Sequence, residues 1–445
     1  TEVPYSESLS EMIPATQKLI DDGVKNICEA SFSYDGCFCS VDILRNLGGN
    51  KVELYEVKSS TEVKDIYKED VSYQNFVLSK LGFDVQKVCL VHINNQYVRH
   101  GELELDKLFK IVDLTDVAKS KVSEVEENIA KFREYLEQET EPECKVGSQC
   151  SSPYDCGYWS HCAVDMPEDG EPTVWSISRL RDKQWYYDNG YITFQQLYDA
   201  GVLKGNYLQQ VEVELKNLPP QIKPKEVSKF LDTLSYPLYF LDFETFNPAI
   251  PLYDESSPYQ QIVFQYSLHY IEKEGGELKH KECLAYPGSD PRRQIAEQLC
   301  KDIPLDVCTT AYNMGFEKGK IRDLAALYPD LHDHLMNIHD NIKDIMIPFQ
   351  KRWYYTKEMQ GSYSIKYVLP ALFPNDESLN YHNLLDVHNG SEAMNTYKLL
   401  GTLSKEELLQ KIKESYPEVQ INFEEAEAIK ILEYTESGRV KTIKF

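Results

Sequence analysis

The sequence lacks any long apolar run. No stretch of about 18 apolar residues that could cross a bilayer occurs, and no charged start followed by a short apolar segment marks a signal peptide. A P-loop, a Rossmann Gly-x-Gly-x-x-Gly motif and a Gly-x-Ser-x-Gly elbow are missing as well. These absences argue against a membrane-spanning protein, a P-loop NTPase, a dinucleotide oxidoreductase and a serine hydrolase, and we expect a cytoplasmic protein.

Positive charge is also in short supply. The 445 residues carry 47 Lys and Arg against 72 Asp and Glu, which gives a formal net charge of -25. This excludes a histone-like protein held on nucleic acid by bulk charge. It leaves open enzymes that use carboxylates to hold metal ions, because a local basic groove can coexist with an acidic remainder. The length predicts two or three domains. Since the chain begins at Thr1 without Met, we expect that an N-terminal segment has been removed.

The first third of the chain predicts a β-β-α-β core. Apolar spacing predicts a helix at 8–30 and a hairpin at 32–44, around the Asp35-Gly36 turn signal. A strand at 51–60, a second helix at 65–82 and a further strand at 83–93 follow.

Four polar residues of this core form a candidate catalytic set. Glu56 and Lys58 share a face of their predicted strand, and Asp42 on the neighbouring strand can meet them, with Gln74 on the next helix. Two carboxylates can bind Mg²⁺, and a lysine can position water or offset charge on a phosphate. The alternative is an exposed strand edge with an ordinary Glu/Lys pair.

This ordered set resembles the PD-(D/E)XK nuclease superfamily, in its RecB-like branch, to which CRISPR-associated iron-sulfur exonucleases belong. The resemblance covers about residues 20–165. It implies a restriction-endonuclease-like domain that hydrolyses DNA with Mg²⁺ or Mn²⁺. Asp42 and Glu56 would be metal ligands, Lys58 the catalytic lysine, and Gln74 with Tyr73 the helix motif.

Four cysteines follow at equal intervals, each pair separated by five residues: Cys144, Cys150, Cys156 and Cys162. Four thiolates this close can hold an iron-sulfur cluster or a zinc ion, although the gaps fit neither zinc C-x₂-C pairs nor ferredoxin spacing. Chance clustering of reduced cysteines is the alternative. The family resemblance favours a [4Fe-4S] cluster on three C-terminal cysteines and one upstream residue, which here would precede Thr1 or be replaced by Cys144.

Residues 166–236 predict a helical connector, broken at Pro- and Gly-rich points. Its segment 178–187 sets basic residues beside aromatics, and residues 351–357 do so again. Such stretches can carry a single strand by charge and stacking. The alternatives are aromatics on a helix core face and a surface loop folded back on the core. The candidate nucleic-acid contacts are Arg181, Trp185, Arg352, Trp353 and Tyr354.

The strand LYFLDFETF, residues 238–246, sets Asp242 and Glu244 on one face. Glu317 directly follows a later strand and starts a helix, which would aim it at these two acids. Three acids meeting there suit two-metal hydrolysis. The intervening segments predict strands, a helix and another strand, the opening of an RNase H-like fold, at 261–271, 280–287, 291–303 and 306–312.

These motifs resemble the DnaQ-like, or DEDD, 3′-5′ exonucleases, with Glu317 in place of the usual Asp. The whole chain further resembles an uncharacterised bacterial family that fuses a RecB-like nuclease to such a domain. Asp344 matches a further acid of that family. Residues 431–443 resemble its terminal helix, with Gly438 at the position of the fourth acid. Either Glu392 or Glu436 compensates, or the second site is weakened.

The sequence thus predicts an α/β protein with a nuclease domain at 1–165, a helical connector at 166–236 and an exonuclease-like domain at 237–445. We expect a metal-dependent nuclease, exonucleolytic on DNA rather than RNA, that acts on single strands or ends and has no membrane partner. One alternative is a non-catalytic nucleic-acid-binding or assembly protein with decayed sites. The other is an RNA exonuclease run by the second module.

Overall fold

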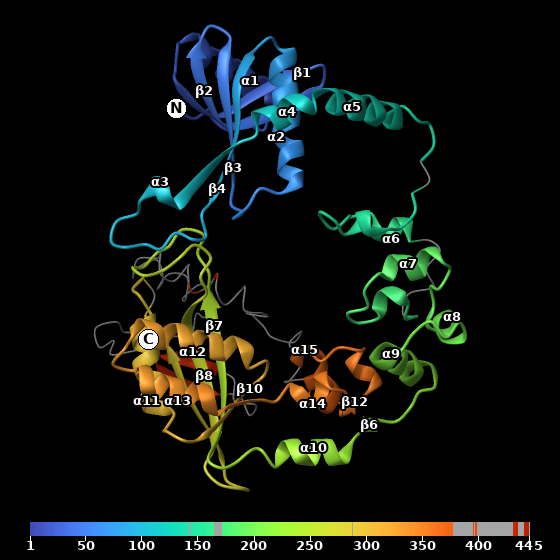
Figure 1. Ribbon diagram of the computed structural model, residues 1–445, viewed down its shortest axis with the longest axis vertical. Coiled ribbons are helices and arrows are strands. Elements are labelled where there is room, and N and C mark those ends of the chain that lie inside the picture. The colour runs from blue at the N-terminus through green and yellow to red at the C-terminus, as the bar shows by residue number, and fades with distance from the viewer. Residues whose placement is uncertain are drawn as a thin grey trace. The chain divides into compact units, whose positions relative to one another are not determined.

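The computed structural model describes residues 1–141, 144–163, 171–286, 288–376, 395, 397, 430–434 and 440–444. The protein is of mixed α/β type and contains two five-stranded sheets, each with parallel and antiparallel pairs (Figure 1). None of the described helices is long and apolar enough to cross a membrane. The chain divides into two compact units, which are Thr1–Cys162 with Pro248–Gln260, and Ala163–Asn247 with Gln261–Phe445.

The first unit is built on a sheet in which every strand pairs with the next along the chain. The pairs are antiparallel except β3 with β4, which run parallel because helix α2 crosses between them. The predicted order of strands and helix is confirmed. The strands are β1 (Asn26–Tyr34), β2 (Cys37–Gly48), β3 (Lys51–Lys58), β4 (Asp84–Ile93) and β5 (Phe109–Asp113).

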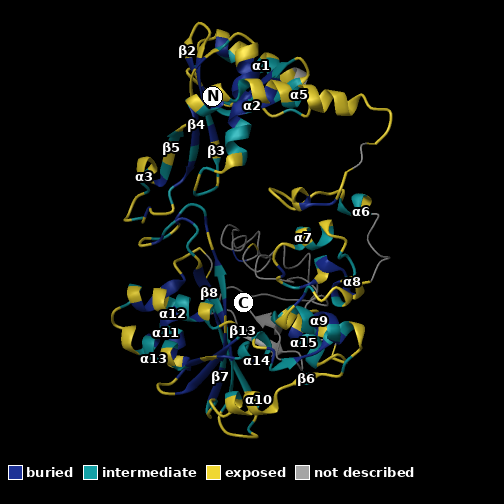
Figure 2. Ribbon diagram, turned by 45° about the vertical axis from the view of Figure 1, so that its right-hand side comes forward, coloured by how far each residue is buried: buried dark blue, intermediate teal, exposed yellow. Residues whose placement is uncertain are grey.

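The helices of this unit share one apolar core with the strands, and Figure 2 shows the buried residues concentrated there. The helix predicted at 8–30 is shorter than expected, because Gly23 (φ +73°) ends it and β1 begins at Asn26. The helices and short helical turns are α1 (Leu9–Asp21), α2 (Asp65–Lys80), α3 (Leu105–Leu108), α4 (Thr115–Ser120), α5 (Val122–Leu136), η1 (Ser148–Cys150) and α6 (Trp159–Cys162).

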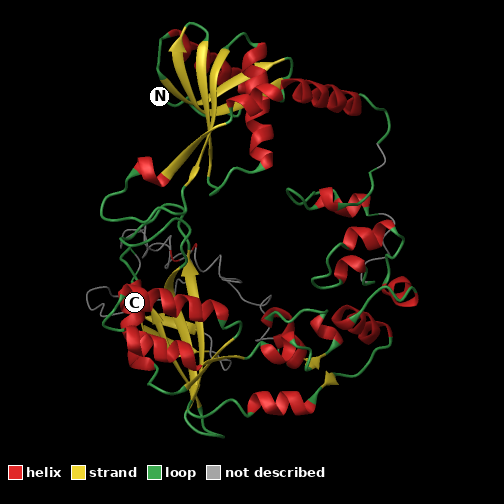
Figure 3. Cartoon of the chain, viewed as in Figure 1, coloured by secondary structure: helices red, strands yellow, loops and turns green. Residues whose placement is uncertain are grey.

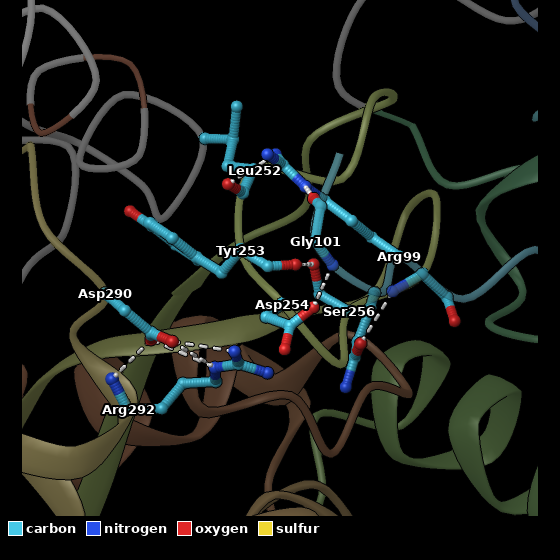
Figure 4. Close-up of polar contacts among 10 residues, drawn as sticks. Arg99, Gly101, Leu252, Tyr253, Asp254, Ser256, Asp290 and Arg292 are labelled. Carbon is cyan, nitrogen blue, oxygen red and sulfur yellow. Dashed lines mark hydrogen bonds and ion pairs between the residues drawn. The ribbon is translucent and has the colours of Figure 1, made fainter. Parts of the chain in front are cut away.

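The segment Pro248–Gln260 belongs to the first unit, although the sequence places it between two strands of the second. Arg99 holds it: its Nη1 donates to the carbonyl oxygens of Pro251 and Leu252 at 3.1 and 2.8 Å, and its backbone N–H donates to Ser256 (Figure 4). Asp254 accepts from the N–H of Gly101 at 2.6 Å. The predicted domain at 237–445 includes this segment, whereas the structure groups it with the first unit.

The second unit begins with short helices, as the sequence predicts for the connector (Figure 3). They enclose a small core of their own around Ile177, Leu197 and Val211, each fully buried. The elements are η2 (Val174–Ser176), α7 (Lys183–Asp188), α8 (Phe194–Asp199), α9 (Gly205–Leu215), β6 (Gln221–Ile222) and α10 (Pro224–Leu231).

The second sheet has the order β11-β10-β7-β8-β9. The first three strands in the chain form an antiparallel meander, and the later two run parallel to β7 on its other edge. The predicted strands and helices are confirmed with small shifts at their ends. The elements are β7 (Leu238–Phe246), β8 (Ile262–Ile271), β9 (Leu278–Leu284), α11 (Arg292–Asp302), β10 (Cys308–Ala311), α12 (Gly315–Leu327), α13 (His332–Asn341) and β11 (Ile342–Asp344).

Alternation along β7 separates two kinds of side chain. Tyr239, Leu241 and Phe243 belong to the core that α11, α12 and α13 close. Asp242 and Glu244 therefore point to the other face of the sheet, since successive side chains of a strand alternate. The fold thus keeps the two acids out of the apolar core.

The last described elements form a small layer beside the connector: α14 (Ile347–Gln350), β12 (Tyr354–Tyr355), η3 (Lys357–Met359) and α15 (Ile365–Leu372). The terminal helix expected at 431–443 is wrong for the described residues there. β13 (Lys430–Tyr434) instead pairs antiparallel with β14 (Val440–Lys444), whose Val-Lys-Thr-Ile-Lys pattern favours a strand. Glu392, Glu436 and Gly438 lie outside the described residues.

Candidate functional site

Lys58, at the end of β3, lies between two carboxylates. Its Nζ is 2.6 Å from Oε1 of Glu56 and 2.6 Å from Oδ2 of Asp70. Desolvation lowers the pKa of the Lys58 ammonium, but the hydrogen bonds and charges of Asp70 and Glu56 outweigh it and leave the pKa raised. The lysine is therefore cationic, and two acids from β3 and α2 fix its position.

Gln74 ties helix α2 to the same group. Its Nε2 donates to Oε2 of Glu56 at 2.8 Å and to Oδ1 of Asp70 at 3.3 Å. Gln74 and Glu56 are both buried. Burial raises the pKa of Glu56, and the charges of Asp42 and Asp70 raise it further, against the hydrogen bonds from Lys58 and Gln74, which lower it. The Glu56 carboxylate is thus held in one orientation by two donors.

Asp42 approaches from β2. Its Oδ2 accepts a hydrogen bond of 2.6 Å from the N–H of Val57, the residue between Glu56 and Lys58. Its effect on the pKa of Glu56 shows that the two carboxylates lie near each other. The hydroxyl of Tyr73 donates to the carbonyl oxygen of Phe38 at 2.9 Å and links α2 to the same strand. The structure therefore brings together all four residues that the sequence singled out.

Sequence reasoning missed Asp70. It lies four residues before Gln74, so that both project from one face of α2. Glu29 falls within the helix predicted at 8–30, but it lies in β1. It is exposed between the paired residues Cys28 and Ala30 and hence opposite Asp42. The i−4 spacing before Gln74 was the signal that would have identified Asp70.

In the second unit, three acids gather around the middle of β7 and the start of α12. Asp242 remains exposed, yet the protein atoms around it desolvate its carboxylate and raise its pKa. Desolvation and the charge of Asp242 raise the pKa of Glu244 to about 7. For Glu317, 3% exposed, desolvation raises the pKa to about 8, helped by the charges of Asp242 and Asp344.

Glu317 also carries an unsatisfied atom. Its Oε2 is buried and has no hydrogen-bond partner among the described residues. Nearby, Asp344 is buried at the end of β11, where its Oδ1 accepts from the N–H groups of Asn313 and Met346, at 3.0 Å each. Asn313 adopts a left-handed conformation (φ +71°) at the turn into α12, which sets the direction of Glu317. Asp344 therefore shapes this turn.

Both acid groups offer the hard oxygen ligands that Mg²⁺ and Mn²⁺ prefer. Oε2 of Glu317 is buried without a hydrogen-bond partner in the described structure, and the carboxylates beside it are desolvated. A divalent cation would supply a ligand contact to these oxygens and balance their negative charge. As placed, however, no group of three or more His, Cys, Asp or Glu side chains in the described part of the chain is arranged to hold a metal ion. The oxygen donors of both groups suit Mg²⁺ or Mn²⁺, and side chains would have to move to surround an ion at either group.

The four clustered cysteines are all free thiols, and they differ in exposure. Cys150 is buried, Cys162 is half-buried, and Cys144 and Cys156 are exposed. The pKa of Cys162 is raised by desolvation and then by Cys144, Cys156 and Cys150, so the four lie near one another. Within the ranges described, they too are not arranged to hold a metal.

The two basic and aromatic stretches, residues 178–187 and 351–357, differ in how far their side chains are exposed. Trp185 is 52% exposed, and with Arg181 it lines a shallow cavity of about 540 Å³. Arg352 is buried rather than exposed on the surface. The stretch packs inward because Tyr354 joins β12 and pairs with β6, while Trp353 accepts a backbone hydrogen bond from Lys223.

Residues 239–364 match a protein family described as a domain of unknown function, DUF2779. The match takes in Asp242, Glu244, Glu317 and Asp344. An uncharacterized protein, UU173 of Ureaplasma parvum serovar 3, is 29% identical over 194 residues, which are 39% of this chain and 27% of that protein. The chain therefore spans little more than a quarter of the length of this relative. Neither description names an activity, so function is argued from the sites.

Proposed function

We propose that this protein is a metal-dependent nuclease that hydrolyses phosphodiester bonds of DNA at the first site. The observation that carries the proposal is the position of Lys58 between Glu56 and Asp70, with Asp42 and Gln74 around them. An ordinary surface ion pair would not require a buried Glu56 held by a buried Gln74. The arrangement supports the resemblance to RecB-like PD-(D/E)XK nucleases.

Each residue has a distinct role in this proposal. Asp42 and Glu56 would hold Mg²⁺ or Mn²⁺, which supplies a Lewis acid and an acidic bound water at neutral pH. Lys58 places a positive charge where negative charge develops on the phosphate. Asp70 orients Lys58, and Gln74 orients Glu56, so both act through a neighbour. Because these supports belong to α2 and β3, rigid elements hold the site.

The second unit is proposed to be an RNase H-like, DnaQ-like exonuclease module. Three antiparallel strands, a helix, and then strands parallel to the first support this fold. The desolvated acids Glu244 and Glu317 beside Asp242 support a second metal site. The cysteines near Cys150 are proposed to hold a [4Fe-4S] cluster, with Zn²⁺ as the alternative.

A nuclease assay with matched substrates tests the proposal. Single- and double-stranded DNA and RNA of one sequence are incubated with Mg²⁺ or Mn²⁺ and with wild type, Lys58→Ala or Asp242→Ala. We expect Lys58→Ala to lower the rate on DNA by about two orders of magnitude or more. Lys51→Ala serves as the control, since Lys51 is exposed at the other end of the same strand. Full activity of Lys58→Ala would refute catalysis at the first site.

The Asp242→Ala arm separates the remaining possibilities. Activity confined to RNA and lost with Asp242→Ala would favour an RNA exonuclease in the second unit, where Asp242, Glu244 and Glu317 lie near one another. Binding of strands without hydrolysis by any form would favour a nucleic-acid-binding or assembly protein. Loss of DNA hydrolysis with both variants would indicate that the two sites act together.

A further inference from the structure

A cavity of about 400 Å³ lies within the second unit, and the acids of β7 are not among its lining residues. Its walls come from the start of α9, from the loop after η2 and from the segment that follows η3. Figures 1 and 2 both show α9 beside the elements from α14 to α15. Its volume falls within the range of cavities that hold small molecules of nucleotide size.

The cavity is cationic in a strongly acidic protein. Arg179, Lys204 and Arg352 line it, and the described residues in its walls include no Asp or Glu. None of these three basic residues forms an ion pair with a described residue. Other basic residues of the described structure do pair with an Asp or Glu; examples are Arg45, Lys80, Lys281 and Arg293. A negatively charged ligand would meet positive charge that the protein has not already neutralised.

Arg352 is the residue that points to a ligand. It is 94% buried, since only 6% of its surface is exposed. Its Nη2 donates to the carbonyl oxygen of Gly361 at 2.6 Å, and its guanidinium lies 3.9 Å from the ring centroid of Tyr355. Its Nη1 is buried without a hydrogen-bond partner in the described structure. Such a charged donor is costly to bury, and an anion in the cavity would compensate it.

The first turn of α9 adds a second source of positive potential. This helix has 11 residues, and its N-cap, Lys204, provides no side-chain hydrogen bond to the free N–H groups. Gly205 and Asn206, at its start, both line the cavity. Backbone N–H groups and the helix dipole at such an N-terminus favour phosphate. The start of the helix thus faces the same space as Arg352.

The opposite wall is rigid. Gly361 has φ +74°, and a Cβ there would collide with the side chain of Gln210. That side chain is buried and fixed by hydrogen bonds to Ser176, Ser178 and Gln360. The carbonyl oxygen of Gly361 in turn fixes Arg352. The cavity is therefore preorganised rather than a loose gap between side chains.

Aromatic groups complete the lining. The guanidinium of Arg179 lies 4.0 Å from the ring centroid of Tyr363, and the hydroxyl of Tyr207 donates to the carbonyl oxygen of Arg179 at 3.1 Å. Planar side chains of this kind offer stacking surface to a nucleobase. Phosphate-binding groups and stacking groups thus occur in one cavity.

We propose that this cavity binds the phosphate monoester of a nucleotide, with the guanidinium groups of Arg179 and Arg352, Lys204 and the start of α9 around the phosphate. Two sources share this chemistry, a free nucleotide and the phosphorylated end of a DNA strand. The binding does not depend on the hydrolytic sites. It would remain if the proposed nuclease function were wrong.

Calorimetric titration in EDTA, which leaves the metal-dependent sites inactive, tests the proposal on the full chain. The probes are thymidine 5′-monophosphate, thymidine, and a short single-stranded DNA with either a 5′-phosphate or a 5′-hydroxyl. Arg179→Ala and Lys204→Ala are the variants, because both side chains are exposed and their removal leaves the core intact. Lys225→Ala, at an exposed position on α10, is the control.

We expect the wild type to bind the monophosphate and not thymidine, and each cavity variant to weaken binding about tenfold or more. Lys225→Ala should bind as the wild type does. Binding of the monophosphate but not of the 5′-phosphorylated strand would assign a free nucleotide, and tighter binding of that strand than of the monophosphate would assign a strand end. Absence of binding at millimolar concentrations, equal binding of thymidine, or unchanged affinity of both cavity variants would overturn the proposal.

Discussion

Replacing Glu317 by Gln should stabilise the protein when no metal is present. Burial raises the pKa of this carboxyl from 4.5 to about 8. Because the folded-state pKa lies above the unfolded value, the folded state binds more protons between these pH values, and stability falls as pH rises through this range. Between pH 5 and 7 the loss is about 1.4 kcal/mol per pH unit, or about 3 kcal/mol in all. Gln has the same shape without the titration.

Urea unfolding in EDTA, at several pH values from 5 to 8, measures this effect. The unfolding free energy of the wild type should fall relative to that of Glu317→Gln by about 3 kcal/mol between pH 5 and 7. Glu226→Gln, at an exposed position on α10, should track the wild type. Parallel curves for the wild type and Glu317→Gln would refute the reasoning, because Glu317 would then ionise in the folded state without cost.

Three further predictions concern other parts of the molecule. Tyr266→Phe should lower the unfolding free energy by about 1–3 kcal/mol in urea denaturation, since it removes a buried 2.6 Å hydrogen bond to Asp302; no loss would show that other partners satisfy this acid. Arg99→Ala should speed amide exchange in Pro248–Gln260, which unchanged exchange would contradict. If the cysteines hold a cluster, Cys150→Ser should abolish brown colour and bound iron after anaerobic purification, whereas Cys300→Ser should not.

Local sequence pattern was sufficient for most of the fold and for the first site. Alternation of apolar residues located β3, and an apolar run located β7. The two-residue period of a strand predicted that Glu56 and Lys58 share a face. The same period separated Asp242 and Glu244 from the apolar core. These predictions succeeded because each depends on a geometry that only a few consecutive residues determine.

What the sequence did not reveal depends on contacts between distant segments. Asp70 is one acid among many in this chain. Its spacing before Gln74 is a local signal, but its contact with Lys58 arises only in the fold. Arg352 occurs in a charged stretch that favours exposure, yet the pairing of β12 with β6 buries it. The assignment of Pro248–Gln260 to the first unit follows from hydrogen bonds to Arg99, which no local pattern encodes.

The two acid groups differ in how their charge is balanced. In the first, Lys58 supplies a cation within hydrogen-bond distance of Glu56 and Asp70. In the second, Asp242, Glu244 and Glu317 form no ion pair with a described residue, and the pKa values of all three are raised. A bound divalent cation would have to displace protons at the second group, because carboxylates ligate as anions. The charge of the first group is therefore balanced by the protein's own lysine, whereas the charge of the second would be balanced by the ion it binds.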